Sequence, residues 1–199
     1  MSEIIRMVVV LSLIAGICSA VLTMANQSLG PRIEQQTDFY VRGPALERLF
    51  GRPAEEVLNN KVVINTGEHE IPVFYLKKDG KISTLAIEAT GKGGYGGDLK
   101  LMIGIDLSNG KQTGLEVVSH SETPGLGARI EEPGFRRQWQ GLPIETEVAL
   151  SSNGGEIDAI SGATSTSTAA VGGTNEALRF LQEHKDEIVT SISERKEQS

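Results

Sequence analysis

The N-terminal stretch from Ile4 to Ala25 constrains this chain most, because nearly every residue in it is apolar and Arg6 is its only charge. An apolar run of about 20 residues is long enough to cross a bilayer as one helix. A cleaved signal peptide is the alternative, since small residues from Cys18 to Ala20 could form a cleavage site. The length of the run favours a retained anchor, so we expect residues 1–25 to form a single membrane helix.

Charge next to this run predicts which side of the membrane the rest of the chain occupies. Arg6 and the amino terminus outweigh Glu3, and positive residues accumulate on the cytoplasmic side of membrane helices. We therefore expect a single-pass protein of the bacterial inner membrane, with its soluble domain on the periplasmic side. Cys18, the only cysteine, lies within the run, which excludes an intrachain disulfide and a cysteine-ligated metal or iron–sulfur site.

The residues after the anchor suffice for about one domain. The whole chain carries a formal net charge of −7 at pH 7, which argues against a nucleic-acid partner because such partners demand a basic surface. The three histidines, His69, His120 and His184, lack the spacing of metal ligands, so we expect no metal site.

Residues 26–60 have a mixed, mostly helical pattern and predict a connector between the membrane and the domain. Pro31 is expected to interrupt this pattern early. Apolar residues from Pro44 to Phe50 recur at helical spacing, and the segment from Pro53 to Leu58 begins with a proline and two acids, as a helix start does.

From residue 61 onward, strand patterns predict an α+β domain over residues 61–199, with a twisted, mostly antiparallel sheet and flanking helices. Asp79-Gly80 and Asn109-Gly110 are hairpin turn signals. Strict alternation of apolar residues from Leu99 to Leu107 indicates a strand that buries one face. The expected strands cover residues 62–64, 71–77, 81–89, 99–107 and 112–119.

Two further segments complete the expected scaffold. Phe135 and Trp139 stand four residues apart, which places them on one face of a short helix and favours core packing over cofactor contact. The segment from Leu142 to Leu150 contains alternating polar and apolar residues and predicts another strand.

The stretch from Asp158 to Thr168 combines small residues, packed hydroxyls and one acid, and apolar residues at helical spacing follow it from Ala169 to Glu194. Ser, Thr and Asp cap helix starts, and a helix start suits a phosphate because its N–H groups are unpaired. The hydroxyls therefore either cap a long helix or bind a ligand at its start. Gly172-Gly173 costs about 1 kcal/mol per glycine in a helix, which indicates close packing there or a helix that begins at Thr174.

The glycine-rich stretch from Gly91 to Gly97 matches the spacing of dinucleotide-binding loops, but a strand rather than a helix follows it. It is therefore expected to be a loop that either turns the chain or lets a ligand approach the backbone closely. Pro124-Gly125 marks a second turn, within the segment from Ser121 to Ala128.

The spacing Asp158-x-x-Ser161-Gly162-Ala163-Thr164-x-Thr166 resembles the flavinylation motif of the FMN-binding domain family. In that family the last threonine carries FMN through a phosphoester, so the resemblance implies that Thr166 is a phosphorylated threonine holding covalent FMN. Residues 91–97 and 121–128 resemble the same family. The resemblance implies further cofactor contacts from Asp158, Ser161, Gly162, Ala163, Thr164, Ser165, Tyr95, Glu122, Thr123, Leu126 and Gly127.

With its apolar N-terminus, the chain looks most like the G subunits of Rnf electron-transport complexes, a family related to the C subunits of the sodium-pumping NADH:quinone reductases. This resemblance implies an electron relay through FMN, without catalytic residues of its own, in a membrane complex that couples ferredoxin:NAD electron transfer to sodium or proton translocation. It implies two kinds of partner: the other subunits, and a flavin transferase that uses FAD and magnesium for maturation. Asp158 would then bind that magnesium, activate the Thr166 hydroxyl or cap the helix.

The sequence is also compatible with two other functions. One is an FMN-free extracytoplasmic domain that holds partner subunits, and the other is a stand-alone membrane-anchored flavoprotein reductase. Covalently bound flavin would separate the first from a flavoprotein, and copurifying membrane subunits would separate the second from a complex subunit.

Overall fold

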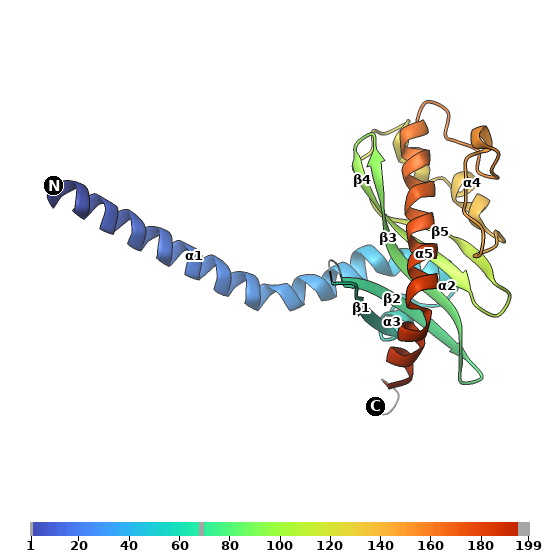
Figure 1. Ribbon diagram of the computed structural model, residues 1–199, viewed down its shortest axis with the longest axis horizontal. Coiled ribbons are helices and arrows are strands. Elements are labelled where there is room, and N and C mark those ends of the chain that lie inside the picture. The colour runs from blue at the N-terminus through green and yellow to red at the C-terminus, as the bar shows by residue number, and fades with distance from the viewer. Residues whose placement is uncertain (1, 68–69, 195–199) are drawn as a thin grey trace. The chain divides into compact units, whose positions relative to one another are not determined.

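A computed structural model describes residues 2–67 and 70–194 of the chain (Figure 1). It divides into two compact units, Met1–Tyr40 and Val41–Ser199. His69 and the polar C-terminal tail beyond Glu194 lie outside the described residues.

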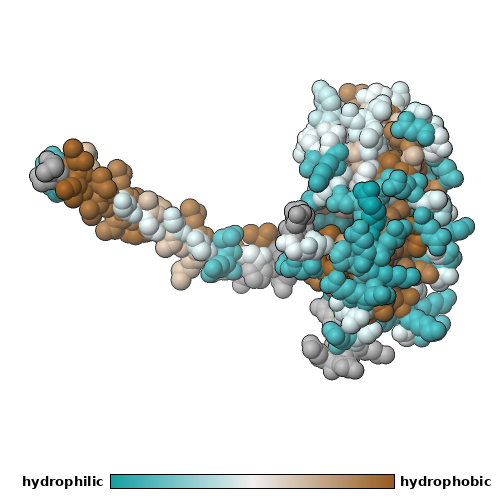
Figure 2. All heavy atoms as spheres, viewed as in Figure 1, coloured by the Kyte–Doolittle hydropathy of each residue, from teal (hydrophilic) through white to brown (hydrophobic). Residues whose placement is uncertain are grey.

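The first unit is formed by α1 (Ser2–Thr37), whose apolar side chains are exposed along most of its length (Figure 2). Its segment Glu3–Gly30 contains an 18-residue window with a mean hydropathy of 2.5, so by length and composition it can cross a membrane. The predicted interruption at Pro31 is wrong, because α1 continues to Thr37. A proline removes one helical hydrogen bond and bends a helix without necessarily ending it.

The second unit is built on a five-stranded antiparallel sheet in which each strand pairs with its neighbours in the sequence, in the order β1-β2-β3-β4-β5. This arrangement confirms the predicted antiparallel sheet, and the turn at Asp79-Gly80 uses positive φ angles as hairpin turns require. The strands are β1 (Lys61–Asn65), β2 (Glu70–Lys78), β3 (Lys81–Gly94), β4 (Gly97–Asp106) and β5 (Lys111–Ser119).

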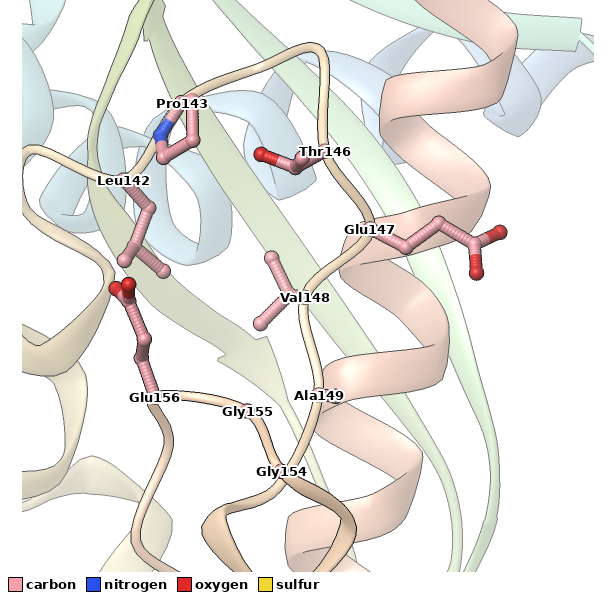
Figure 3. A pocket seen from close by; sticks show the side chains of 9 residues that line it. All are labelled: Leu142, Pro143, Thr146, Glu147, Val148, Ala149, Gly154, Gly155 and Glu156. Atoms are coloured by element: carbon pink, nitrogen blue, oxygen red, sulfur yellow. The ribbon is translucent and has the colours of Figure 1, made fainter.

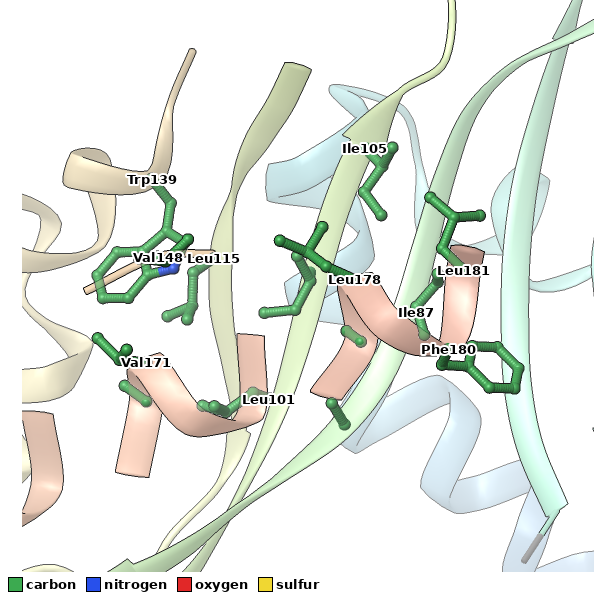
Figure 4. Packing of buried hydrophobic residues seen from close by; sticks show 14 of the residues in the cluster. Ile87, Leu101, Ile105, Leu115, Trp139, Val148, Val171, Leu178, Phe180 and Leu181 are labelled. Atoms are coloured by element: carbon green, nitrogen blue, oxygen red, sulfur yellow. The ribbon is translucent and has the colours of Figure 1, made fainter. Parts of the chain in front are cut away.

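One face of this sheet is covered by α5 (Thr164–Glu194), the predicted amphipathic helix (Figure 4). Leu178 and Leu181 of the helix belong to the same buried cluster as Leu101 and Ile105 of β4. Burial of each such side chain contributes roughly 1.5–3 kcal/mol, so this layer supplies most of the domain's hydrophobic stabilisation.

The other face is covered by α2 (Gly43–Phe50) and α3 (Ala54–Leu58), which fall within the segment predicted as a connector. Leu46 of α2 packs with Phe74 and Met102 of the sheet. The alternating residues from Leu99 to Ile105 are buried, which confirms the predicted buried face, and Met102 on the opposite face is fully buried as well. The alternation that suggests one buried face reflects only the larger of the two cores.

Short helical turns connect β5 to α5: η2 (Gly127–Glu131), α4 (Pro133–Arg136), η3 (Arg137–Trp139) and η4 (Ser151–Asn153). Phe135 and Trp139 are buried and stack edge-to-face with ring centroids 5.2 Å apart, which confirms their prediction as core residues.

The predicted strand from Leu142 to Leu150 is wrong, since this segment forms only isolated bridges at its two ends. The reason is that a side chain, and not a neighbouring strand, forms hydrogen bonds with its backbone N–H and carbonyl groups. The side chain of Asn175 on α5 accepts a hydrogen bond from the Val148 N–H (2.8 Å) and donates one to the Val148 carbonyl (2.9 Å). A single amide side chain thus substitutes for a neighbouring strand.

The glycine pair within α5 lies where the helix crosses the sheet. A Cβ atom at Gly173 would lie 2.9 Å from the Gly91 nitrogen and 2.9 Å from Leu101 Cδ1, whereas a Cβ at Gly172 would meet nothing within 4 Å. Close packing therefore explains Gly173, and the alternative of a helix beginning at Thr174 is wrong because α5 begins at Thr164.

Candidate functional site

Three segments that are distant in the sequence meet at the start of α5. They are the turn between β3 and β4 (residues 94–97), the segment 121–127 after β5, and the segment 161–166 that enters α5. The Thr166 hydroxyl donates a hydrogen bond to Glu122 Oε2 (2.9 Å), and Glu122 Oε1 accepts one from the Gly96 N–H (3.1 Å). Glu122 thus joins all three segments.

The start of α5 is fixed by Ser167 rather than by the acid of the motif. Ser167 Oγ accepts a hydrogen bond from the Ile160 N–H (2.9 Å) and donates one to the Ala163 carbonyl (3.0 Å). The Ala163 N–H bonds to the Ile160 carbonyl, closing the turn before the helix. The first-turn N–H groups of Thr164 and Ser165 have no helical acceptor, as at any helix start, and both residues are exposed.

Glycines make the convergence possible, because several backbone segments approach too closely for a Cβ atom. A Cβ at Gly127 would lie 2.0 Å from Glu122 Oε2 and 2.8 Å from Thr166 Oγ1. A Cβ at Gly94 would lie 2.5 Å from Glu122 Oε1, and one at Gly96 would lie 2.0 Å from the Ser121 carbonyl oxygen. The glycines of both loops therefore surround the carboxylate of Glu122.

The glycine-rich stretch is only partly the loop that its sequence predicts. β3 extends to Gly94, so Gly91 lies within the strand and against the Ala169 carbonyl of α5, while the turn is confined to Tyr95 and Gly96. The pairing of β3 with β4 shifts register between Gly91 and Gly94, at this end of the hairpin. The strand β4 follows the stretch, as predicted, where a dinucleotide-binding loop would be followed by a helix.

The predicted contact residues divide into buried and exposed groups. Thr166 is fully buried and Glu122 is 6% exposed. Ala163 and Gly127 are also buried, whereas the remaining predicted residues are exposed on the surrounding surface. These exposed residues are Tyr95, Thr123, Leu126, Asp158, Ser161, Gly162, Thr164 and Ser165. The Thr166 hydroxyl therefore lies just beneath a surface that the predicted contacts form.

Asp158 is a predicted contact residue whose described hydrogen bonds lead to Gln138 and not to Thr166. Its backbone N–H donates to Gln138 Oε1 (2.7 Å) and its carbonyl accepts from Gln138 Nε2 (3.2 Å). Among residues 2–67 and 70–194, its exposed carboxylate forms no hydrogen bond or ion pair, so it caps no helix there. The carboxylate that contacts Thr166 is that of Glu122.

His120 holds the segment that carries Glu122. Its Nδ1 accepts a hydrogen bond from the Glu122 N–H (3.0 Å), and its Nε2 lies 3.3 Å from Glu131 Oε1. An accepting Nδ1 requires the proton on Nε2, so the ring links Glu122 to Glu131 as the neutral tautomer. His120 follows β5 directly. No sequence pattern signals this contact.

The residues around Thr166 fit the phosphate and ring of FMN in chemistry. The exposed first turn of α5 offers N–H and hydroxyl donors to a phosphate, and Leu126 (46% exposed) and Tyr95 (78% exposed) offer apolar surface to a flat ring. The hydroxyl that would carry the phosphate belongs to a fully buried residue, and Gly127 packs close to it. No cluster of metal ligands occurs within the described part of the chain.

A cavity of about 230 Å³ lies apart from these residues, between the segment 142–149 and the turn at Gly154 (Figure 3). It is smaller than most small-molecule sites. None of the predicted flavin contacts lines it. Much of its wall is backbone with Val148 and Leu142 side chains, and it offers no match to a flavin.

Residues 94–179 match the family model described as FMN-binding domain, and this interval contains the three converging segments. The G subunit of the ion-translocating oxidoreductase complex of Methanosarcina acetivorans is 30% identical over 187 residues, covering 90% of this chain and 95% of that protein. Its namesake from Haemophilus influenzae (strain PittEE) is 40% identical over 115 residues, covering 55% of each chain. The chain thus aligns with little more than half the length of several of its curated relatives.

Among solved structures, the C subunit of the Na(+)-translocating NADH-quinone reductase from Parabacteroides distasonis is similar to this chain with a TM-score of 0.51 and 26% identity. The similarity covers 63% of this chain and 78% of that one. The antiparallel sheet with its covering helices is therefore the fold of that protein.

Proposed function

Because this chain belongs to the family of G subunits of ion-translocating oxidoreductase complexes, we propose that it is a membrane-anchored flavoprotein that relays electrons within such a complex. FMN, when bound, supplies the redox chemistry, since protein side chains have no comparable electron carrier. The chain's own residues bind and orient the cofactor. The complex would couple ferredoxin:NAD electron transfer to sodium or proton translocation, as the family resemblance implies.

Thr166 is the proposed point of covalent attachment, through a phosphoester between its hydroxyl and the FMN phosphate. The observation that carries this proposal is the convergence of three distant segments on the Thr166 hydroxyl at the start of α5. Free N–H groups of the first helical turn would hold the phosphate. Leu126 and Tyr95 would pack against the ring, and Thr123 would supply a polar contact at its edge.

The proposed setting is the outer side of the bacterial inner membrane, with α1 as the single anchor. A covalent tether suits this setting, because a freely dissociating cofactor would be lost there. Its partners would be the other subunits of the complex and, during maturation, a flavin transferase that uses FAD and magnesium. Protease added outside the inner membrane should digest the chain after α1; digestion only from the cytoplasmic side would overturn this placement.

Intact mass of the full chain purified from its native membrane tests the attachment. The expected mass exceeds that of the polypeptide by one FMN less one water, and the added mass should lie on the peptide that contains Thr166. Thr166→Ala should abolish it. Covalent flavin retained in that variant would assign attachment to Thr164 or Thr168 instead, and a native chain without flavin would favour a scaffold domain.

A further inference from the structure

Glu122 is a buried carboxylate that accepts its hydrogen bonds from neutral groups. Its side chain accepts from the Thr166 hydroxyl and the Gly96 N–H, and within the described residues no Lys, Arg or His side chain forms an ion pair with it. The other buried glutamate, Glu116, is paired with the guanidinium groups of Arg48 and Arg136. A buried charge without a counter-ion loses its hydration without an opposite charge to compensate for it, so an ionised Glu122 is unfavourable for stability.

The carboxylate is also fixed in position. The His120 ring holds its backbone N–H, and a Cβ at Gly94 or Gly127 would overlap its two oxygens, at 2.5 Å and 2.0 Å respectively. Only glycines fit around it, and they leave one oxygen directed at Thr166. A fixed acceptor at hydrogen-bond distance from a hydroxyl has the geometry of a general base.

We propose that Glu122 is the general base that activates Thr166 for attachment of the flavin, an inference that rests on Thr166 being the attachment point. Thr166 Oγ would bond to the phosphorus of FAD that carries riboflavin. The bond from that phosphorus to the bridging oxygen breaks, and AMP leaves with the bridging oxygen and its electron pair. The Thr166 proton passes to the Glu122 carboxylate, as a carboxylate accepts the hydroxyl proton when kinases phosphorylate alcohols.

The same proton transfer resolves a conflict that attachment creates. The new phosphodiester carries a negative charge beside Glu122, and two like charges in contact disfavour each other strongly. After the transfer Glu122 is neutral, and its new O–H can donate a hydrogen bond to an oxygen of the phosphodiester. Thr166, once esterified, can no longer donate to Glu122, so the direction of the hydrogen bond reverses and the buried pair stays satisfied.

Neither neighbouring acceptor can take this role. The Asp158 carboxylate is exposed and does not contact Thr166. Ser167 is occupied by bonds to Ile160 and Ala163 that fix the helix start. Among the described residues, Glu122 is therefore the one whose side chain hydrogen-bonds to the reacting hydroxyl.

The test uses the full chain in detergent, produced without a flavin transferase, then incubated with purified transferase, FAD and Mg²⁺. The rate of mass gain is followed by intact mass spectrometry, and the melting temperature of each variant is measured beforehand. Glu122→Gln preserves the size of the side chain and one of its two acceptor oxygens, but the amide cannot take the proton. We expect it to slow attachment by about 10²–10⁴-fold. Glu132→Gln, which removes an exposed carboxylate paired with Arg129, is the matched control and should match the wild-type rate.

A second variant keeps the test decisive if Glu122→Gln is less stable. Glu122→Asp retains a carboxylate set back by one methylene, so it should attach flavin much faster than the Gln variant whatever their melting temperatures. If both variants lost the same fraction of the attachment rate, in proportion to their loss of stability, Glu122 would have only a structural role. Wild-type attachment in Glu122→Gln with none in Thr166→Ala would overturn the role of Glu122 alone. Attachment in Thr166→Ala would overturn Thr166 as the attachment point, the part of the proposed function on which this inference rests.

Discussion

Two buried hydroxyls of α5, Thr166 and Thr174, each form a 2.9 Å hydrogen bond to a side chain far away in the sequence, yet the two regions differ in chemistry. Thr174 Oγ1 accepts from the Trp139 indole and donates to the Ala170 carbonyl, so every group there is neutral and satisfied. Thr166 instead meets a carboxylate for which the described residues provide no counter-ion. The first region holds the fold together, and the second keeps a reactive pair in place at some cost to stability.

The largest effect that separates the two regions is expected from removing each hydroxyl while keeping the shape of the side chain. Thr166→Val should abolish covalent flavin, and Thr174→Val should retain it in full. Intact mass of the two variants, produced together with a flavin transferase, is the measurement. Loss of flavin in a folded Thr174→Val protein would mean that the two regions are not separable.

The next largest effect is expected from a methyl group at Gly127. The added Cβ would overlap Glu122 Oε2 and crowd Thr166 Oγ1, so Gly127→Ala should displace the carboxylate and slow flavin attachment by at least about tenfold, since a displacement of about 1 Å at a reacting group can cost about 10²-fold in rate. The control is Gly134→Ala, where a Cβ meets nothing within 4 Å and φ is not positive. An unchanged rate in Gly127→Ala would show that the pair is not tightly positioned.

Much of the sheet could be predicted from the sequence, because its signals are local. Alternating apolar residues and two turn dipeptides define β2 to β5, and neighbouring strands in the sequence are neighbours in the sheet. The motif likewise marks the start of α5. The features that the local signals do not predict depend on side chains from distant parts of the sequence. Asn175 replaces a strand partner for Val148, and α2 buries the second face of β4.

The contact between Glu122 and Thr166 could not be predicted for the same reason. The two residues are 44 positions apart and meet only because β3 to β5 return the chain to the start of α5. Sequence spacing instead indicates Asp158 as the acid beside the hydroxyl. The hydrogen bonds of Asp158 to Gln138 keep its backbone at the rim of the site.

A smaller effect, on stability rather than on flavin, is expected from the glycine pair in the structural region. Gly173→Ala would press a methyl group against the Gly91 nitrogen and Leu101, which should lower the free energy of unfolding by about 1–3 kcal/mol. Gly172→Ala, with open space around its Cβ, should raise it by up to about 1 kcal/mol through helix propensity. Denaturant unfolding of the two variants measures the difference. Equal shifts would contradict the close contact between α5 and β3.

The smallest effect that we expect concerns the stability of Thr174→Val. This change leaves the buried Trp139 N–H without an acceptor, which costs about 1–3 kcal/mol, partly offset because the added methyl is apolar and the buried hydroxyl is removed. A shift of about 2–4 °C in melting temperature per kcal/mol follows for a chain of this size. Trp139 is the only tryptophan, so its fluorescence reports directly on loss of the hydrogen bond. Trp139→Phe removes the hydrogen-bond donor. In that background Thr174→Val should lower the stability less than it does in the wild-type chain, because no indole N–H is left unpaired. If the stability losses of the two single variants simply added in the double variant, the Trp139–Thr174 hydrogen bond would not couple the segment before α5 to that helix. Thr174 would then have no demonstrated structural role, and only Thr166 would support the distinction between a structural and a reactive hydroxyl.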